Sequence, residues 1–223
     1  MIFLPIAFPL LLLFFVLLLG LLIFFIEIRV LAYAYRKIGV RPRYIFLVMI
    51  LSLIGSHVNI PLYSVPVPRL SPPHEMSLYG RHYLVPGTIE PGASVVAINV
   101  GGALIPILVS LYLLLRTRMV VRMLVGTAIV AFIVHQLADV VPGMGIAVPM
   151  IVPPLSAAAV ALLLAFRRAP PVAYVSGSMG ALIGADILNL DRIADLGAPM
   201  VSIGGAGTFD GVFLTGIIAG LIA

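Results

Sequence analysis

The sequence predicts an all-α fold: a polytopic transmembrane helical bundle that forms a single integral membrane domain over residues 1–223. Hydrophobic residues make up 62% of the chain and charged residues only 9%, whereas a soluble domain carries about 25% charged residues. Several apolar runs also exceed the ~20 residues that a helix needs to cross the hydrocarbon core. These runs lack the alternation that is typical of transmembrane strands. The composition therefore excludes an ordinary soluble enzyme.

The apolar runs predict about seven spans. The first begins near Pro9, because proline suits the start of a helix. It lacks the basic start and the cleavage site of a signal peptide, so we expect it to remain in the protein. The predicted spans are residues 9–35, 44–63, 93–115, 119–141, 149–166, 172–190 and 208–223.

Basic residues separate these spans and orient the bundle. They cluster after spans one, three and five, at residues 36–43, 116–122 and 167–168. The other connections together hold only Arg69, Arg81 and Arg192. Because cytoplasmic loops are enriched in Lys and Arg, this alternation predicts a multi-pass protein of the plasma membrane with its N-terminus outside and its C-terminus in the cytoplasm. The same clusters account for the net charge of +5 without a nucleic-acid partner.

One connection, residues 65–92, is long and contains six prolines. In the predicted topology this Pro-rich loop lies outside. Two interpretations stay open: a lid or binding element, or a proline-stiffened tether.

Amino-acid usage restricts the chemistry further. The absence of cysteine excludes disulfides, thiolate metal sites and cysteine nucleophiles. The chain also has only three Asn and one Gln, and a scarcity of thermolabile side chains is typical of thermophile proteins.

Polar side chains inside the spans mark the candidate site, because ionisable groups at membrane depth are costly and usually functional. In the predicted topology they gather near the outer ends of spans two, four, six and seven. They are His57, Asn59, His135, Asp139, Asp186 and Asp210. This convergence predicts one outward-facing site.

His135 and Asp139 are four residues apart, so in a helix they share one face. This spacing suits one metal ion or one proton, and the alternative is a hydrogen-bonded pair that joins two helices. If a metal is present, His135, Asp139 and Asp210 are the candidate ligands, with Asp186 as a further one.

A glycine-rich segment precedes the last span. Gly204, Gly205, Gly207 and Gly211 predict a tight backbone turn. A helix that begins after such a turn presents free N–H groups, and transporters use broken helices of this kind as binding sites. The alternative is a simple turn in which Asp210 caps the helix.

Four motifs also carry a resemblance to a known family. They are Ser-His-Val-Asn-Ile-Pro at residues 56–61, Asn-Val-Gly-Gly at 99–102, Gly-Ala-Asp at 184–186, and Ser-Ile-Gly-Gly-Ala-Gly-Thr-Phe-Asp-Gly at 202–211. From about Ile50 onward the chain resembles a prokaryotic multi-pass membrane family known as domain of unknown function sixteen-fourteen. The resemblance implies a membrane protein and points to the same residues, but it brings no activity.

Three functions stay open. The favoured one is binding or transport of a cation or proton, together with a small solute, because acidic clusters beside broken helices suit cations. The second is an intramembrane hydrolase, either aspartyl-type with Asp186 and Asp210 as the catalytic pair or metal-dependent. The third is a structural scaffold in which polar groups join the helices. The expected partner is the lipid bilayer, and a bound cation is the one cofactor that the sequence indicates.

Overall fold

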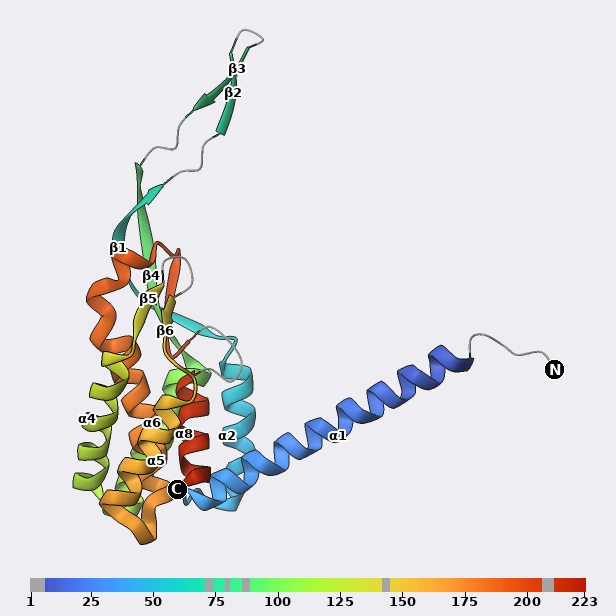
Figure 1. The fold of residues 1–223 in the computed structure, drawn as a ribbon, viewed down its shortest axis with the longest axis vertical. Helices are drawn as coiled ribbons and strands as arrows, with labels where there is room; N and C mark the ends of the chain where they lie inside the picture. The colour runs from blue at the N-terminus through green and yellow to red at the C-terminus, as the bar shows by residue number, and fades with distance from the viewer. Residues whose placement is uncertain (1–6, 71–73, 79–80, 86–88, 142–144, 206–210) are drawn as a thin grey trace, which may run out of the picture.

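The structure is a computed structural model that describes residues 7–70, 74–78, 81–85, 89–141, 145–205 and 211–223. It is mostly helical, and a long β ribbon rises from one end of the helical body (Figure 1). We call the ribbon, residues 59–99, the β arm, and the packed helices the helical body.

Most helices begin where the sequence provides a proline. Pro42, Pro106, Pro153 and Pro170 each lie in the first two positions of a helix, where a missing N–H costs nothing. The helices are α1 Ala7–Lys37, α2 Pro42–Gly55, α3 Ile105–Thr117, α4 Val120–Gln136, α5 Val152–Ala165, α6 Ala169–Ala181, α7 Ile193–Leu196 and α8 Gly211–Ile222. Short helical turns extend some of them: the π-helical η1 Val100–Leu104 and η3 Leu182–Asp186, and the 3-10 turns η2 Phe166–Arg168 and η4 Ile187–Arg192.

Three of the described helical stretches are long and apolar enough to cross a membrane: Pro9–Lys37, Val100–Thr117 and Val152–Arg192. The last one reverses at η2, so α5 and α6 lie side by side (Figure 1). Three further apolar helices are shorter: Pro42–Gly55, Val120–Gln136 and Gly211–Ile222. Most of α1 leaves the body and exposes its apolar side chains, as a helix surrounded by lipid does.

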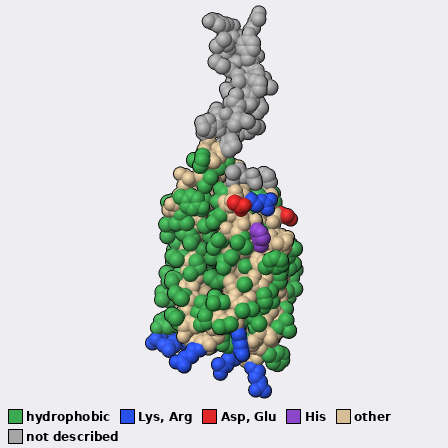
Figure 2. Space-filling model, turned by 90° about the vertical axis from the view of Figure 1, so that its left-hand side faces the viewer, with side chains coloured by type: hydrophobic (Ala, Val, Ile, Leu, Met, Phe, Trp, Pro, Cys, Tyr) green, Lys and Arg blue, Asp and Glu red, His purple; other side chains and the backbone are tan. Residues whose placement is uncertain are grey.

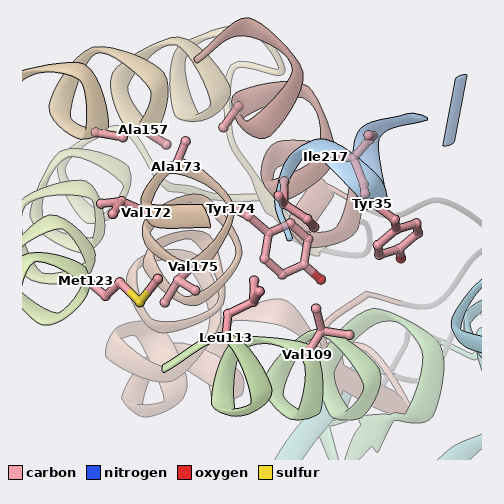
Figure 3. Packing of buried hydrophobic residues seen from close by; sticks show 14 of the residues in the cluster. Tyr35, Val109, Leu113, Met123, Ala157, Val172, Ala173, Tyr174, Val175 and Ile217 are labelled. Atoms are coloured by element: carbon pink, nitrogen blue, oxygen red, sulfur yellow. The ribbon is translucent and has the colours of Figure 1, made fainter. Parts of the chain in front are cut away.

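The helix α6 is the centre of the body and packs against α3, α4, α5 and α8. Its side chains at residues 172–178 are all buried. Figure 3 shows Tyr174 and Val175 of this helix among side chains from α1, α3, α4 and α8. Glycines allow the close approach: a Cβ at Gly126 would lie 2.3 Å from Ser176 Oγ, and one at Gly216 would lie 1.9 Å from Ser178 Oγ. Small residues at helix contacts are how membrane helices pack tightly.

The prediction of an all-α fold is wrong at the arm end of the body. Span two was predicted to continue to residue 63 and span three to begin at residue 93, but α2 ends at Gly55 and the helical turn η1 begins only at Val100. Strands lie where these predicted spans would have extended. Runs such as residues 95–98 are apolar and rich in β-branched side chains, which favour strands. Hydropathy alone does not distinguish a strand from a helix in such short runs.

Where the structure describes them, residues 65–92, predicted as a Pro-rich loop, instead belong to paired strands of the β arm. β1 Asn59–Leu70 pairs antiparallel with β4 Ile89–Asn99, and the hairpin of β2 His74–Leu78 and β3 Arg81–Val85 lies beyond them (Figure 1). Prolines are tolerated because β1 is an edge strand: Pro66 and Pro68 are two residues apart, so both nitrogens face the same side of the strand.

Two short pairings complete the strands. β7 Met200–Ile203 adds to the other side of β4 in parallel. β5 Asp139–Val141 pairs with β6 Gly145–Ala147. Beneath the three-stranded sheet, a second apolar cluster that includes Val96, Leu182 and Ile203 fixes the sheet to the body. The sheet therefore places the ends of β1, β4 and β7 directly above the helix ends.

At the opposite end, α1 is fastened to α8. Lys37 Nζ donates a hydrogen bond to Leu221 O at 2.7 Å, and a cation at a helix C-terminus also interacts favourably with the helix dipole. We expect Lys37→Met to lower the free energy of unfolding by about 1 kcal/mol. Unfolding in mild detergent titrated with dodecyl sulfate measures this loss. Arg36→Gln, an exposed neighbour, is the control, and an equal loss in both variants would contradict the role of Lys37.

Candidate functional site

Polar side chains from the four sequence motifs meet where the β arm enters the helical body. Asn99, the last residue of β4, is fully buried there. Its Nδ2 donates to Ser56 O at 2.8 Å and to Asn59 Oδ1 at 3.0 Å. Its Oδ1 accepts from the backbone N–H of Gly102 at 2.7 Å and so caps η1. One amide therefore holds the end of α2, the start of β1 and the start of η1 together.

Asn59 extends this network to the C-terminal part of the chain. Its Oδ1 also accepts a hydrogen bond from Ser202 Oγ at 2.6 Å, and Ser202 lies in β7. The hydrogen bonds Ser56–Asn99–Asn59–Ser202 thus join three segments that are far apart in the sequence. We call these four residues the amide network.

Beside the amide network, two backbones touch. A Cβ at Gly102 would lie 1.9 Å from Gly204 O, so only glycine fits at this contact. After β7 the chain turns through Gly204 and Gly205, whose φ angles of +84° and +79° are left-handed, a conformation that glycine adopts without strain. They are two of the four glycines for which sequence analysis predicted a backbone turn.

Asp186 accepts a hydrogen bond from this turn. The backbone N–H of Gly204 donates to Asp186 Oδ2 at 2.7 Å. Asp186 is half-buried and is the last residue of the π-helical turn η3. A π turn interrupts the regular hydrogen bonds of a helix, and here Asn189 replaces them: its Nδ2 donates to Gly184 O at 3.1 Å and to Ala185 O at 2.9 Å.

Asp186 lines a cavity of about 640 Å³ between β7, the ends of α6 and α8, and the segment around β6. Ser202 and Thr215 are the polar uncharged residues of its lining, and most of the other lining side chains are apolar. Among the described lining residues, Asp186 is the one ionisable side chain. The cavity therefore combines one carboxylate with a mostly apolar lining.

The two candidate histidines, His57 and His135, lie at helix ends near the β arm but are not among the residues that line this cavity. His57 is exposed, and its Nδ1 lies 3.1 Å from Leu53 O and 3.3 Å from Ser56 Oγ, which are local contacts. His135 is half-buried, and its Nδ1 lies 3.4 Å from Asn189 Nδ2. His135 thus touches the residue that supports the π turn next to Asp186.

The prediction that His135 and Asp139 share a helix face is wrong. The helix α4 ends at Gln136, and Asp139 begins β5, where it pairs with Ala147 and is exposed. The pairing of β5 with β6 ends the helical geometry on which the spacing argument depended.

The other predicted site residues are placed as follows. Asp210 and Gly207 lie outside the described residues. Gly211 begins α8 and lines the cavity. Within the part of the chain that the structure describes, no three His, Asp or Glu side chains come close enough to hold a metal ion. The metal set of His135, Asp139 and Asp210 thus includes one residue that the structure does not describe.

Sequence analysis did not select Asn99 or Ser202 as site residues. A signal for Asn99 existed, because the chain has only three asparagines. All three, Asn59, Asn99 and Asn189, make side-chain hydrogen bonds at this end of the body. For Ser202 the available signal was its place at the start of the motif at residues 202–211, because serine itself is common in packed helices and turns.

Comparison with known families gives one match. Residues 53–222 match the family model described as "Protein of unknown function (DUF1614)". This range contains the amide network, the cavity residues and the β arm. No curated protein and no solved structure matches the chain.

Proposed function

Since the chain belongs to the DUF1614 family, a family whose description names no activity, we propose its function from the cavity at Asp186. The protein is a multi-pass membrane protein that binds and transports a cation or a proton. The carboxylate of Asp186, held at an interrupted helix and facing a cavity whose described lining has no basic side chain, is the observation that carries this proposal.

The chemistry of the lining favours a small cation. Carboxylate, hydroxyl and carbonyl oxygens are the ligands of hard cations, and interrupted helices supply such oxygens in ion-coupled transporters. The single negative charge of the Asp186 carboxylate is neutralised by one monovalent cation or one proton. With Asp186 as the single ionisable group among the described lining residues, a monovalent cation or a proton fits better than a divalent ion.

Placement in the membrane follows from the same architecture. We propose that α1, α2, α3, α4, α5, α6 and α8 are the seven crossing segments, with the β arm outside. On the face drawn in Figure 2, several Lys and Arg side chains gather at the end of the body opposite the β arm, whereas one Lys or Arg side chain lies near the arm beside acidic and His side chains. This distribution supports a cytoplasmic location for the basic end. In this orientation the cavity at Asp186 lies in the outer half of the membrane.

Thermal unfolding of the purified protein in mild detergent tests the proposal. We compare wild type with Asp186→Asn in sodium, in potassium, and across pH. A ligand that binds only the native state stabilises it by ~2.7 kcal/mol at a hundredfold excess over its dissociation constant. We expect one cation, or protonation, to raise the melting temperature of wild type and to leave Asp186→Asn unchanged.

The substitution should preserve the fold, because the Asn side-chain oxygen can still accept from the Gly204 N–H. Asp139→Asn is the matched control, since Asp139 is an exposed carboxylate at the same end of the body and should keep the full cation effect. The proposal fails if no cation or pH change stabilises wild type, or if Asp186→Asn retains the gain. Collapse of Asp186→Asn without any ion effect would favour the structural scaffold.

An intramembrane aspartyl hydrolase is the second candidate. Two carboxylates that share a proton can activate water, and Asp186 lines a cavity that also reaches Gly211, the neighbour of Asp210 in the sequence. Peptide hydrolysis that is lost in both Asp186→Asn and Asp210→Asn, with no cation-dependent stabilisation of wild type, would replace the transport proposal.

A further inference from the structure

A second hollow lies at the opposite end of the helical body. It has a volume of about 810 Å³ and is lined by residues 117–122, between α3 and α4, and by residues 164–168, between α5 and α6. Four arginines contribute to its wall: Arg118, Arg122, Arg167 and Arg168. We call it the basic hollow.

The four guanidinium groups are exposed and have no counterion within the described chain. None of them makes a hydrogen bond or an ion pair with another described residue. Arg116, a close neighbour in sequence, is different, because it donates to Gly39 O and to the Tyr112 hydroxyl at 2.7 Å. Four like charges around one hollow repel each other, and an anion that enters it relieves this repulsion.

The guanidinium group selects the kind of anion. It is planar and presents paired N–H donors that match phosphate oxygens. The backbone of one of the four arginines is also unusual. Arg118 has a φ of 55° and is the one described non-glycine residue with a positive φ. Left-handed backbone at a non-glycine residue is uncommon and often accompanies a functional position.

Apolar side chains frame the basic hollow. Val121 is 74% exposed, Phe166 is 78% exposed, and Leu163, one turn away on α5, is 87% exposed. Arginines beside exposed apolar side chains at a helix end match the boundary between lipid headgroups and acyl chains. A phosphate that reaches the hollow from a lipid brings acyl chains to cover these side chains, whereas a free phosphate would leave them uncovered.

We propose that the basic hollow binds the phosphate headgroup of an anionic phospholipid, with its acyl chains against Val121, Leu163 and Phe166. This inference rests on the membrane placement proposed above but not on cation binding at Asp186. The two arginine pairs come from separate helix connections, so a bound headgroup would join the α3–α4 turn to the α5–α6 turn.

Native mass spectrometry of the full-length protein, titrated with dioleoyl phosphatidylglycerol or dioleoyl phosphatidylcholine in detergent, tests the proposal. We expect wild type to retain phosphatidylglycerol at least tenfold more tightly than phosphatidylcholine. Arg122→Gln/Arg167→Gln should lose this preference, because one charge is removed from each wall of the hollow. Arg36→Gln/Arg41→Gln removes the same number of exposed charges elsewhere on the basic side of the chain and should keep it.

Further variants separate the hollow from other causes. Arg122→Lys/Arg167→Lys keeps the charge and should restore part of the preference, which a fold defect in the glutamine variant would not allow. Asp186→Asn should bind phosphatidylglycerol as wild type does, so failure of the cation proposal is distinguishable from failure of this one.

Three results would overturn the lipid site. One is equal retention of the two lipids by wild type. Another is an equal loss of preference in the Arg36/Arg41 control. The third is displacement of the lipid by millimolar inorganic phosphate, which would identify a soluble anion as the ligand.

Discussion

Replacing Gly102 by Ala is expected to destabilise the protein by about 3 kcal/mol. The added Cβ would lie 1.9 Å from Gly204 O, a backbone atom rather than a flexible side-chain end. Neither backbone is free to shift. The N–H of Gly102 bonds to Asn99 Oδ1, and the N–H of Gly204 bonds to Asp186 Oδ2, both at 2.7 Å. The clash therefore either breaks one of these hydrogen bonds or separates the turn after β7 from η1.

Gly20→Ala is the matched control for this substitution. Gly20 lies inside the exposed helix α1, and a Cβ there would meet nothing within 4 Å. Alanine in a helix interior is favoured over glycine by roughly 0.5–1 kcal/mol, so the control should be stabilised. Unfolding by dodecyl sulfate in detergent micelles measures both variants. If Gly102→Ala unfolds at the same denaturant level as wild type, the tight backbone contact is not present in solution.

The second large effect is expected at Asn99. Asn99→Ala should cost about 3 kcal/mol, because it leaves Ser56 O and the Gly102 N–H buried without partners. An unsatisfied buried polar group costs roughly 1–3 kcal/mol. The same unfolding assay measures the loss. Ser156→Ala, which removes only a local bond to Pro153 O, is the control and should cost no more than about 1 kcal/mol.

A double-mutant cycle between Asn59 and Asn99 tests whether the amide network acts as a unit. The two side chains bond to each other at 3.0 Å, so the two losses should overlap by roughly 1 kcal/mol. Additive losses would mean that the two amides act independently and would contradict the network.

Much of the helical body was predictable from hydropathy. The spans predicted at residues 149–166 and 172–190 correspond to α5 and to α6 with its helical turns, because those runs are long, apolar and begin near prolines. The strands were not predictable in the same way. Residues 93–99 are mostly apolar, as are the helices beside them, and their extended conformation depends on pairing partners that the local sequence does not reveal.

For the candidate site, sequence analysis selected individual polar side chains but did not predict the hydrogen bonds between them. The polar side chains that sequence analysis selected include Asp186 and Asn59; Asp186 lines a cavity, and Asn59 bonds to Asn99 and Ser202 at the arm end of the body. The prediction that His135 and Asp139 share a helix face was wrong, because it required the helix to continue beyond Gln136. The central role of Asn99 was missed, because an uncharged amide in an apolar run attracts less notice than a carboxylate, although its burial makes its bonds more consequential.

The parallel pairing of β4 with β7 has a consequence for the order of events during synthesis. Residues 95–98 leave the ribosome before α3, α4, α5 and α6, whereas their partners at residues 200–203 leave after all four helices. Contacts between distant segments form late, because the intervening chain must first be brought together. Until then Asn59 lacks the hydroxyl of Ser202, and Asp186 lacks the amide of Gly204. The cavity thus acquires its final wall only when the last stretch of the nascent chain arrives, after most of the helices have been synthesised.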